Sequence, residues 1–141
     1  MSLVLPSPIH LRVAAHLLQT GGVIAYPTEG VWGLGCDPMN ERAVRRLLEL
    51  KQRPEAKGLI IIAASLSQAA QWLRELDARQ RAACAATWPG PYTWVVPAQV
   101  APVWLRGQHD SVAVRVTAHP GVQALCHAFG GALVSTSANV S

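Results

Sequence analysis

Residues 51–63 read KQRPEAKGLIIIA, and the last six letters, GLIIIA, predict a strand inside a β-sheet. This apolar run does not alternate with polar residues, so both of its faces need cover. Three cations, Lys51, Arg53 and Lys57, stand directly before it, and Pro54 stiffens the segment that carries them. The sequence therefore places dense positive charge at the edge of a buried strand, where a rigid phosphate-binding site needs it.

The net positive charge of the chain is concentrated around this strand. The net charge is +4, and between positions 41 and 57 six cations stand against three anions, an excess of three. Such a local field favours a phosphate-bearing partner, either a nucleotide or a nucleic acid. The alternative is a solvated helix end with long, flexible side chains, where Lys51 would also suit the negative helix C-terminus. The six cations are Arg42, Arg45, Arg46, Lys51, Arg53 and Lys57.

Helical and strand patterns alternate along the chain, which predicts one α/β domain over residues 1–141 with a mixed, mostly internal sheet. In the first helix, Ile9, Val13 and Leu17 are expected to share an apolar face with Ala14 and Leu18. The glycine-rich segment 27–37 is expected to be irregular. Helices are predicted at 8–20, 41–51, 65–73, 78–87 and 120–129, and strands at 23–26, 58–63, 92–96, 111–116 and 132–135.

Composition excludes several classes of protein. No apolar run approaches the roughly 18 residues that cross a bilayer, and the N-terminus shows no charged leader followed by an apolar segment. Three widely spaced cysteines argue against a disulfide framework or a zinc site. We therefore expect a cytoplasmic protein with no membrane partner and no metal held by its side chains.

Familiar nucleotide-binding and catalytic motifs are missing from the sequence. The glycines of GVWGLG (30–35) have the reverse of the dinucleotide spacing, no helix is expected after them, and no P-loop pattern occurs. No histidine has metal-ligand spacing or a partner in a recognisable nucleophile motif. His119, followed by Pro120, is expected to begin a helix rather than to act as a base.

Polar residues collect where predicted strands end, and ligands of open α/β sheets bind at such ends. The groups are Thr28, the Lys51 loop, Ser111 with Arg115, and the segment STSANVS (135–141). The last is either an ordinary polar turn or a set of donors around phosphate or ribose oxygens. Arg115 is either a charge on the wet face of its strand or a guanidinium placed to bind a carboxylate. We expect the four groups to converge.

Five segments, taken together and in order, resemble the YrdC-like (TsaC-type) threonylcarbamoyl-AMP synthase family. Each segment is a weak signal alone, but the ordered set covers nearly the whole chain. The segments are YPTEGVWGLGCD (26–37), LLELKQRPEAKGLIIIA (47–63), WPGPYTWVV (88–96), DSVAVRVTAHP (110–120) and LVSTSANVS (133–141).

The resemblance implies a YrdC-like fold, in which a twisted, mixed, open sheet flanked by helices curves around a basic groove. It implies that L-threonine, bicarbonate or carbon dioxide, and ATP give threonylcarbamoyl-AMP and pyrophosphate, with Mg2+ on the triphosphate. A tRNA threonylcarbamoyl-transferase partner enzyme then transfers the group to tRNA. The threonine amine is the nucleophile, so the enzyme needs no Ser–His or Cys–His pair.

The resemblance also assigns residues. Lys51 and Arg53 stand at the catalytic phosphate positions. ATP binding is implied for Lys51, Arg53, Ser111, Ser137 and Asn139, and threonine binding for Thr28, Lys57, Arg115 and Ser135.

The sequence departs from the family pattern in places. Gly30 and Trp32 replace commoner residues near the threonine pocket, and Lys57-Gly58 stands where relatives often have His-Pro or Asn-Pro. The chain is also expected to stop a few dozen residues before short family members do, and those residues of relatives include further serine and arginine contacts to ATP.

Two other functions fit the same residues less well. One is a module that binds double-stranded RNA or tRNA in ribosome or tRNA maturation, since backbone phosphates also attract a basic groove. The other is the related module of hydrogenase-maturation carbamoyltransferases, whose zinc-finger-like and acylphosphatase-like segments are not found here.

Overall fold

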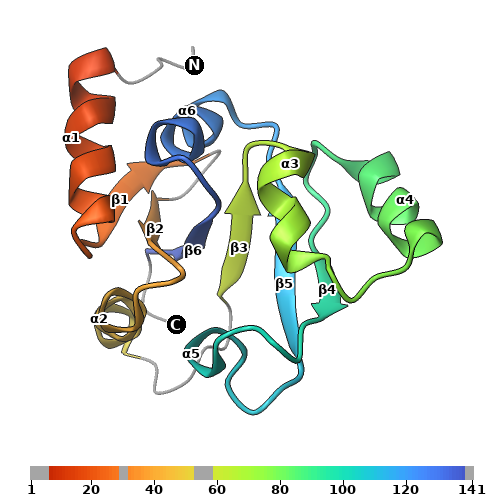
Figure 1. Ribbon diagram of the computed structural model, residues 1–141. Helices are drawn as coiled ribbons and strands as arrows, with labels where there is room; N and C mark the ends of the chain where they lie inside the picture. The colour runs from red at the N-terminus through yellow and green to blue at the C-terminus, as the bar shows by residue number, and fades with distance from the viewer. Residues whose placement is uncertain (1–6, 29–31, 53–58, 139–141) are drawn as a thin grey trace.

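A six-stranded sheet with helices packed against it organises the computed structural model (Figure 1), which describes residues 7–28, 32–52 and 59–138. Figure 1 shows α1 and α6 side by side near β1, and α3 packs against β3 and β5. The elements in chain order are α1 (Pro8–Gln19), β1 (Ile24–Pro27), β2 (Trp32–Cys36), α2 (Glu41–Lys51), β3 (Ile60–Ala63), α3 (Leu66–Ala69), the 3-10 helix η1 (Ala70–Trp72), α4 (Ala78–Thr87), β4 (Trp94–Pro97), α5 (Val103–Arg106), β5 (Ser111–Val116), α6 (Pro120–Phe129) and β6 (Leu133–Ser137).

The strand order in the sheet is β1-β2-β6-β3-β5-β4. The β3–β5 pair is parallel and the other pairs are antiparallel. The strand predicted from GLIIIA lies inside the sheet, where Ile61 stands opposite both Val114 of β5 and Val134 of β6. The mixed, open sheet and the internal position of this strand are confirmed.

Local sequence signals set the helix starts. The Asn40 side chain accepts a hydrogen bond of 3.0 Å from the Ala43 amide at the start of α2. Asp77 and Gln80 form a reciprocal capping box at the start of α4. Capping of this kind satisfies the free amides of a first helical turn without tertiary partners, which is why the sequence predicts these starts closely.

The two faces of the sheet carry separate apolar clusters. Ile61, Val114 and Val134 belong to the cluster that α2, η1 and α4 help to cover. Ile62 and Leu133 belong to the other cluster, together with buried residues of α1 and α6. Because neighbouring strand residues point to opposite faces, one short strand supplies both cores.

The prediction that residues 27–37 are irregular is wrong for residues 32–36, because β2 occupies Trp32–Cys36 between β1 and β6. Glycine disfavours strands when it packs against nothing. Here Gly33 and Gly35 lie against the ring of Tyr26, and a Cβ at either glycine would come within 2.9 Å of a ring carbon. The aromatic ring fills the space that the missing side chains leave, so the strand forms despite its glycines.

The predicted apolar face of α1 is also wrong in part. Ile9, Val13 and Leu17 are 63%, 54% and 46% exposed, whereas Leu18 is fully buried. Leu18 packs in the same cluster as residues of α6. The helix period allows either neighbouring stripe to face inward, and the position of α6 decides between them.

Within the described ranges, none of the helices has the length and apolarity that a membrane crossing requires.

We expect Gly35→Ala to lower the free energy of unfolding by about 1–3 kcal/mol, the usual cost of overpacking a tight site. Its new Cβ would lie 2.9 Å from a Tyr26 ring carbon and 3.2 Å from the Val134 carbonyl oxygen. Urea unfolding measures the loss. Gly131→Ala is the control, since its nearest neighbour would lie 3.9 Å away, and its change should stay within about 0.5 kcal/mol. Equal stabilities of the two variants would contradict the tight packing of Tyr26.

Candidate ligand-binding site

A cavity of about 630 Å³ lies on the sheet face that carries Ile62. Strands β2, β3, β5 and β6 form its floor, and the start of α6 and the turn at Gly90 form its walls. A cavity of this size accommodates a small-molecule ligand. The residues that line it are Thr28, Gly33, Ile60, Ile62, Gly90, Pro91, Arg115, Thr117, Ala118, His119, Val122, Ser135, Thr136 and Ser137.

Two hydroxyls of β6 stand on the cavity floor, because Ser135 and Ser137 are two positions apart and share a face. The Ser135 Oγ is hydrogen-bonded to the Tyr26 hydroxyl. The Ser137 Oγ accepts a hydrogen bond of 3.3 Å from Lys51 Nζ. β6 therefore connects a buried phenol and a cation to the same cavity.

Lys51 is the last residue of α2 and is only 3% exposed. A cation that is so deeply buried needs polar partners, and Ser137 is one of them. The other cations of α2 behave differently. Arg45 pairs with Glu41 at 2.6 Å and Arg46 with Glu49 at 3.7 Å, all with well-exposed side chains.

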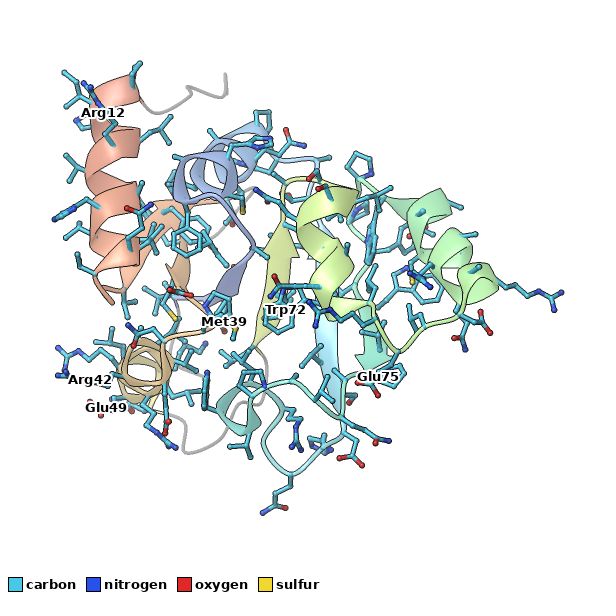
Figure 2. The ribbon with its side chains drawn as sticks, viewed as in Figure 1. Arg12, Met39, Arg42, Glu49, Trp72 and Glu75 are labelled. Atoms are coloured by element: carbon cyan, nitrogen blue, oxygen red, sulfur yellow. The ribbon has the colours of Figure 1, made fainter. Side chains whose placement is uncertain are left out.

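Figure 2 shows Arg42 and Glu49 on the side of α2 that faces away from the sheet. The predicted cation cluster therefore divides in two. The arginines of α2 are its solvated face, where ion pairs contribute little, while Lys51 turns inward.

Arg115 lines the cavity from β5, on the face opposite Val114 and Val116. Its Nε is buried and has no hydrogen-bond partner within the described part of the chain. Buried donors in folded proteins are almost always paired. An acceptor on a bound ligand would satisfy this one.

His119 begins α6, as predicted. Its Nδ1 accepts a hydrogen bond of 3.2 Å from the Val122 amide, and its own amide donates to Thr117 Oγ1 at 3.0 Å. Because Nδ1 accepts, the neutral ring carries its proton on Nε2. That Nε2 is buried and without a partner among the described residues. The side chain lines the cavity, although the sequence alone suggested only a helix cap.

The structure brings most of the predicted site residues together. Thr28, Arg115, Ser135 and Ser137 line one cavity, and Lys51 contacts Ser137. The predicted convergence of polar strand ends is thus observed for these residues.

The structure does not place the remaining predicted residues in this cavity. Ser111 shares the Arg115 face of β5 but is not among the lining residues, since four strand residues span roughly 13 Å. Arg53, Lys57 and Asn139, like Gly30, lie outside the described residues. Sequence reasoning assigned no role in the site to Tyr26 or Thr117, and expected His119 to begin a helix rather than to act as a base. No local motif marks them, because their closeness to the cavity comes from strand pairing and from the turn before α6.

The cysteines do not offer a nucleophile. All three are free and buried. Burial raises the pKa of Cys36 and of Cys126 to about 12, with Asp37 adding to the effect at Cys36. A thiol with such a pKa stays protonated near neutral pH and is a weak nucleophile.

The described residues form a mixed sheet with a cavity that Arg115 and two serine hydroxyls line. Comparison with known protein families identifies the family to which the chain belongs. The Sua5_yciO_yrdC family model, described as "Telomere recombination", matches residues 16–141. The chain belongs to this Sua5/YciO/YrdC family, which confirms the predicted YrdC-like membership.

Relatives and solved structures agree with this assignment. The threonylcarbamoyl-AMP synthase of Halorhodospira halophila is 61% identical over 135 residues, which cover 95% of this chain and 71% of the relative. The enzyme of the same name from Methylococcus capsulatus is 55% identical over 136 residues, 96% of this chain and 73% of the relative.

Among solved structures, P. abyssi Sua5 complexed with L-threonine has a TM-score of 0.85 and 36% identity, covering 96% of this chain. E. coli YciO has a TM-score of 0.79 and 26% identity, covering 96% of this chain and 69% of YciO. The chain spans only 40% of the P. abyssi Sua5 chain. These likenesses confirm the predicted fold.

The contribution of His119 to stability as the N-cap of α6 can be measured by comparing two variants. We expect His119→Ala to lower the free energy of unfolding by about 1 kcal/mol, and His119→Asn to retain most of it, because Asn is a good N-cap and Ala is not. Urea unfolding compares the two variants. Equal losses would show that the bond to the Val122 amide does not stabilise α6.

Tyr26 should weaken the fold at alkaline pH. Burial raises the pKa of Tyr26 from 10.0 to about 12, so between these values the folded state holds a proton that the unfolded chain has released. This contribution is complete below about pH 10 and is lost as the pH rises toward 12. The free energy of unfolding should therefore fall more steeply in the wild type than in Tyr26→Phe, by at most about 1.4 kcal/mol per pH unit. Parallel urea curves from about pH 9 to 11 test this, and identical slopes would contradict it.

Proposed function

We propose that this chain is a threonylcarbamoyl-AMP synthase, which joins L-threonine, bicarbonate and ATP into threonylcarbamoyl-AMP and releases pyrophosphate and water. The observation that carries the proposal is the shared cavity, which Arg115, Ser135 and Ser137 line and in which Ser137 accepts a hydrogen bond from Lys51. Relatives of this name at 55–61% identity, and a similar structure that holds L-threonine, support it.

The amino-acid end of the cavity is assigned to Thr28, Arg115 and Ser135. A guanidinium on a rigid strand binds a carboxylate well, and the buried Nε of Arg115 has no partner in the described ranges. The hydroxyls of Thr28 and Ser135 border the same space. Lys57 joins this set from the sequence motif alone.

The phosphate end is assigned to Lys51 and Ser137. Lys51 is held at 3.3 Å from Ser137, and a buried cation interacts more strongly with a phosphate than an exposed one does. From the sequence motif we add Arg53 and Asn139, and Ser111 as a nucleotide contact further along β5.

The reaction needs positioning more than it needs a reactive side chain. The amine of L-threonine combines with bicarbonate, losing water, to give a carbamate. A carbamate oxygen then forms a bond to the α-phosphorus of ATP while the bond from this phosphorus to pyrophosphate breaks. The protein contributes by holding the reactants in line and offsetting the phosphate charge.

Mg2+ is proposed to enter on the triphosphate. Among the residues that the structure describes, no group of three His, Cys, Asp or Glu side chains is placed to hold a metal ion. When bound, the ion would offset charge on the phosphates that leave.

The product has a mixed anhydride bond and requires an acceptor. We propose that a partner enzyme transfers its threonylcarbamoyl group to tRNA, in the cytoplasm, where three free, buried cysteines suit a reducing medium. RNA binding by this chain itself is the weaker alternative. A duplex backbone is bound by exposed cations, whereas Lys51 is 3% exposed.

The direct test incubates the purified protein with ATP, Mg2+, bicarbonate and L-threonine. Mass spectrometry of the mixture should show threonylcarbamoyl-AMP and release of pyrophosphate, both dependent on L-threonine and bicarbonate. L-Serine in place of L-threonine tests the amino-acid pocket. Absence of both products from a folded, ATP-binding protein would reject the proposed reaction.

Arg115→Lys should weaken binding at the amino-acid end of the cavity and leave binding at the phosphate end unchanged. It keeps the charge and removes the Nε donor, so the KM for L-threonine should rise about tenfold or more while the KM for ATP stays within about twofold. Steady-state pyrophosphate release gives both constants. Arg81→Lys, on the exposed face of α4, is the matched control. An equal rise in both KM values would reject the carboxylate assignment of Arg115.

A further inference from the structure

Tyr26 occupies a slot made for its ring. It lies on β1, is 4% exposed and stands opposite Gly33 in the β1–β2 register. A Cβ on Gly33 or Gly35 would come within 2.9 Å of its ring carbons. The two glycines therefore fix the position of the ring, and with it the position of the phenol oxygen.

The phenol oxygen meets a residue of the proposed amino-acid site. The Tyr26 hydroxyl is hydrogen-bonded to the Ser135 Oγ, across 109 positions of sequence. Ser135 stands opposite Gly35 in the β2–β6 register and lines the cavity. Tyr26 is not among the lining residues, so it acts behind Ser135 rather than on a ligand.

The direction of this hydrogen bond follows from the acidity of the two groups. A phenol has a pKa of about 10, far below that of an aliphatic alcohol, and is the stronger donor. Burial raises the pKa of Tyr26 further, to about 12, so the phenol keeps its proton at working pH. If Tyr26 donates, the Ser135 proton is directed to another acceptor, and the open side of Ser135 is the cavity.

We propose that Tyr26 is a positioning residue, which donates to Ser135 so that the Ser135 hydroxyl donates into the cavity to a carboxylate oxygen of the amino-acid substrate. This inference rests on the proposed function. It gives the amino-acid carboxylate a second donor beside Arg115, whose buried Nε has no partner in the described part of the chain. It also accounts for the two glycines in the middle of β2, which leave room for the ring that positions Ser135.

The decisive variant is Tyr26→Phe, which removes only the hydroxyl and keeps the ring between the glycines. We expect the KM for L-threonine to rise about five- to tenfold, the effect of one misdirected hydrogen bond, with the KM for ATP unchanged. Ser135→Ala should raise the KM for L-threonine at least as much. Because Tyr26 acts through Ser135, the double variant should be no worse than Ser135→Ala alone.

A purely structural role of Tyr26 is tested by Leu18→Val. Leu18 is fully buried in the same apolar cluster as Tyr26 and lies outside the cavity lining. The Leu18→Val variant should have a lower melting temperature and an unchanged KM for L-threonine. Calorimetric titration with L-threonine in the absence of ATP gives the same comparison without turnover.

The outcomes distinguish a failure of the positioning role of Tyr26 from a failure of the proposed function. If the wild type makes threonylcarbamoyl-AMP and Tyr26→Phe binds L-threonine equally well, the positioning role is overturned while the proposed function stands. Additive losses in the double variant would likewise overturn it, because Tyr26 would then act independently of Ser135. If the wild type neither binds L-threonine nor forms product, the proposed function fails, and the inference fails with it.

Discussion

The central place of β6 in the sheet is the constraint on which the rest of the site depends. β6 pairs with β2 on one side and β3 on the other, so its backbone is fixed along both edges. Strand alternation then sends Val134 into one apolar cluster and Leu133 into the other. Ser135 and Ser137 continue the Leu133 face beyond the cover of the helices and form the cavity floor. A polar site thus stands on a strand held by two neighbours, and its hydroxyls are preorganised.

Two cations of the described residues lie at or beside this floor. Lys51 arrives from the end of α2 and Arg115 from β5, and both have buried polar atoms. Cations removed from water are costly unless they have polar partners, and Lys51 has one in Ser137. The arginines of α2 remain in solvent with their glutamates. The basic residues of the described chain therefore divide into surface charges and a small number of cations with buried polar atoms.

No reactive side chain is needed in such a site. The thiols of Cys36 and Cys126 have pKa values of about 12, and His119 Nδ1 is occupied by the cap of α6. What remains is a set of fixed donors, which suits a reaction whose nucleophile comes from the substrate. The ring of Tyr26 packs against Gly33 and Gly35, and its hydroxyl is connected to the site by the hydrogen bond to Ser135. Rigid support behind the residues in contact with substrate is the usual means of keeping such geometry.

The sequence by itself determined the features that depend on near neighbours: the caps at Asn40 and Asp77, the buried strand in GLIIIA and the alternation around Arg115. It also determined the family, through motifs in a fixed order. Tertiary structure decided that residues 32–36 form a strand, that Ile9 faces solvent, and that Ser111 stands apart from the cavity. It also brought Lys51 to Ser137 and Tyr26 to Ser135, across 86 and 109 positions. Capping and alternation are governed by neighbouring residues, whereas these contacts exist only once the strands have paired in one register.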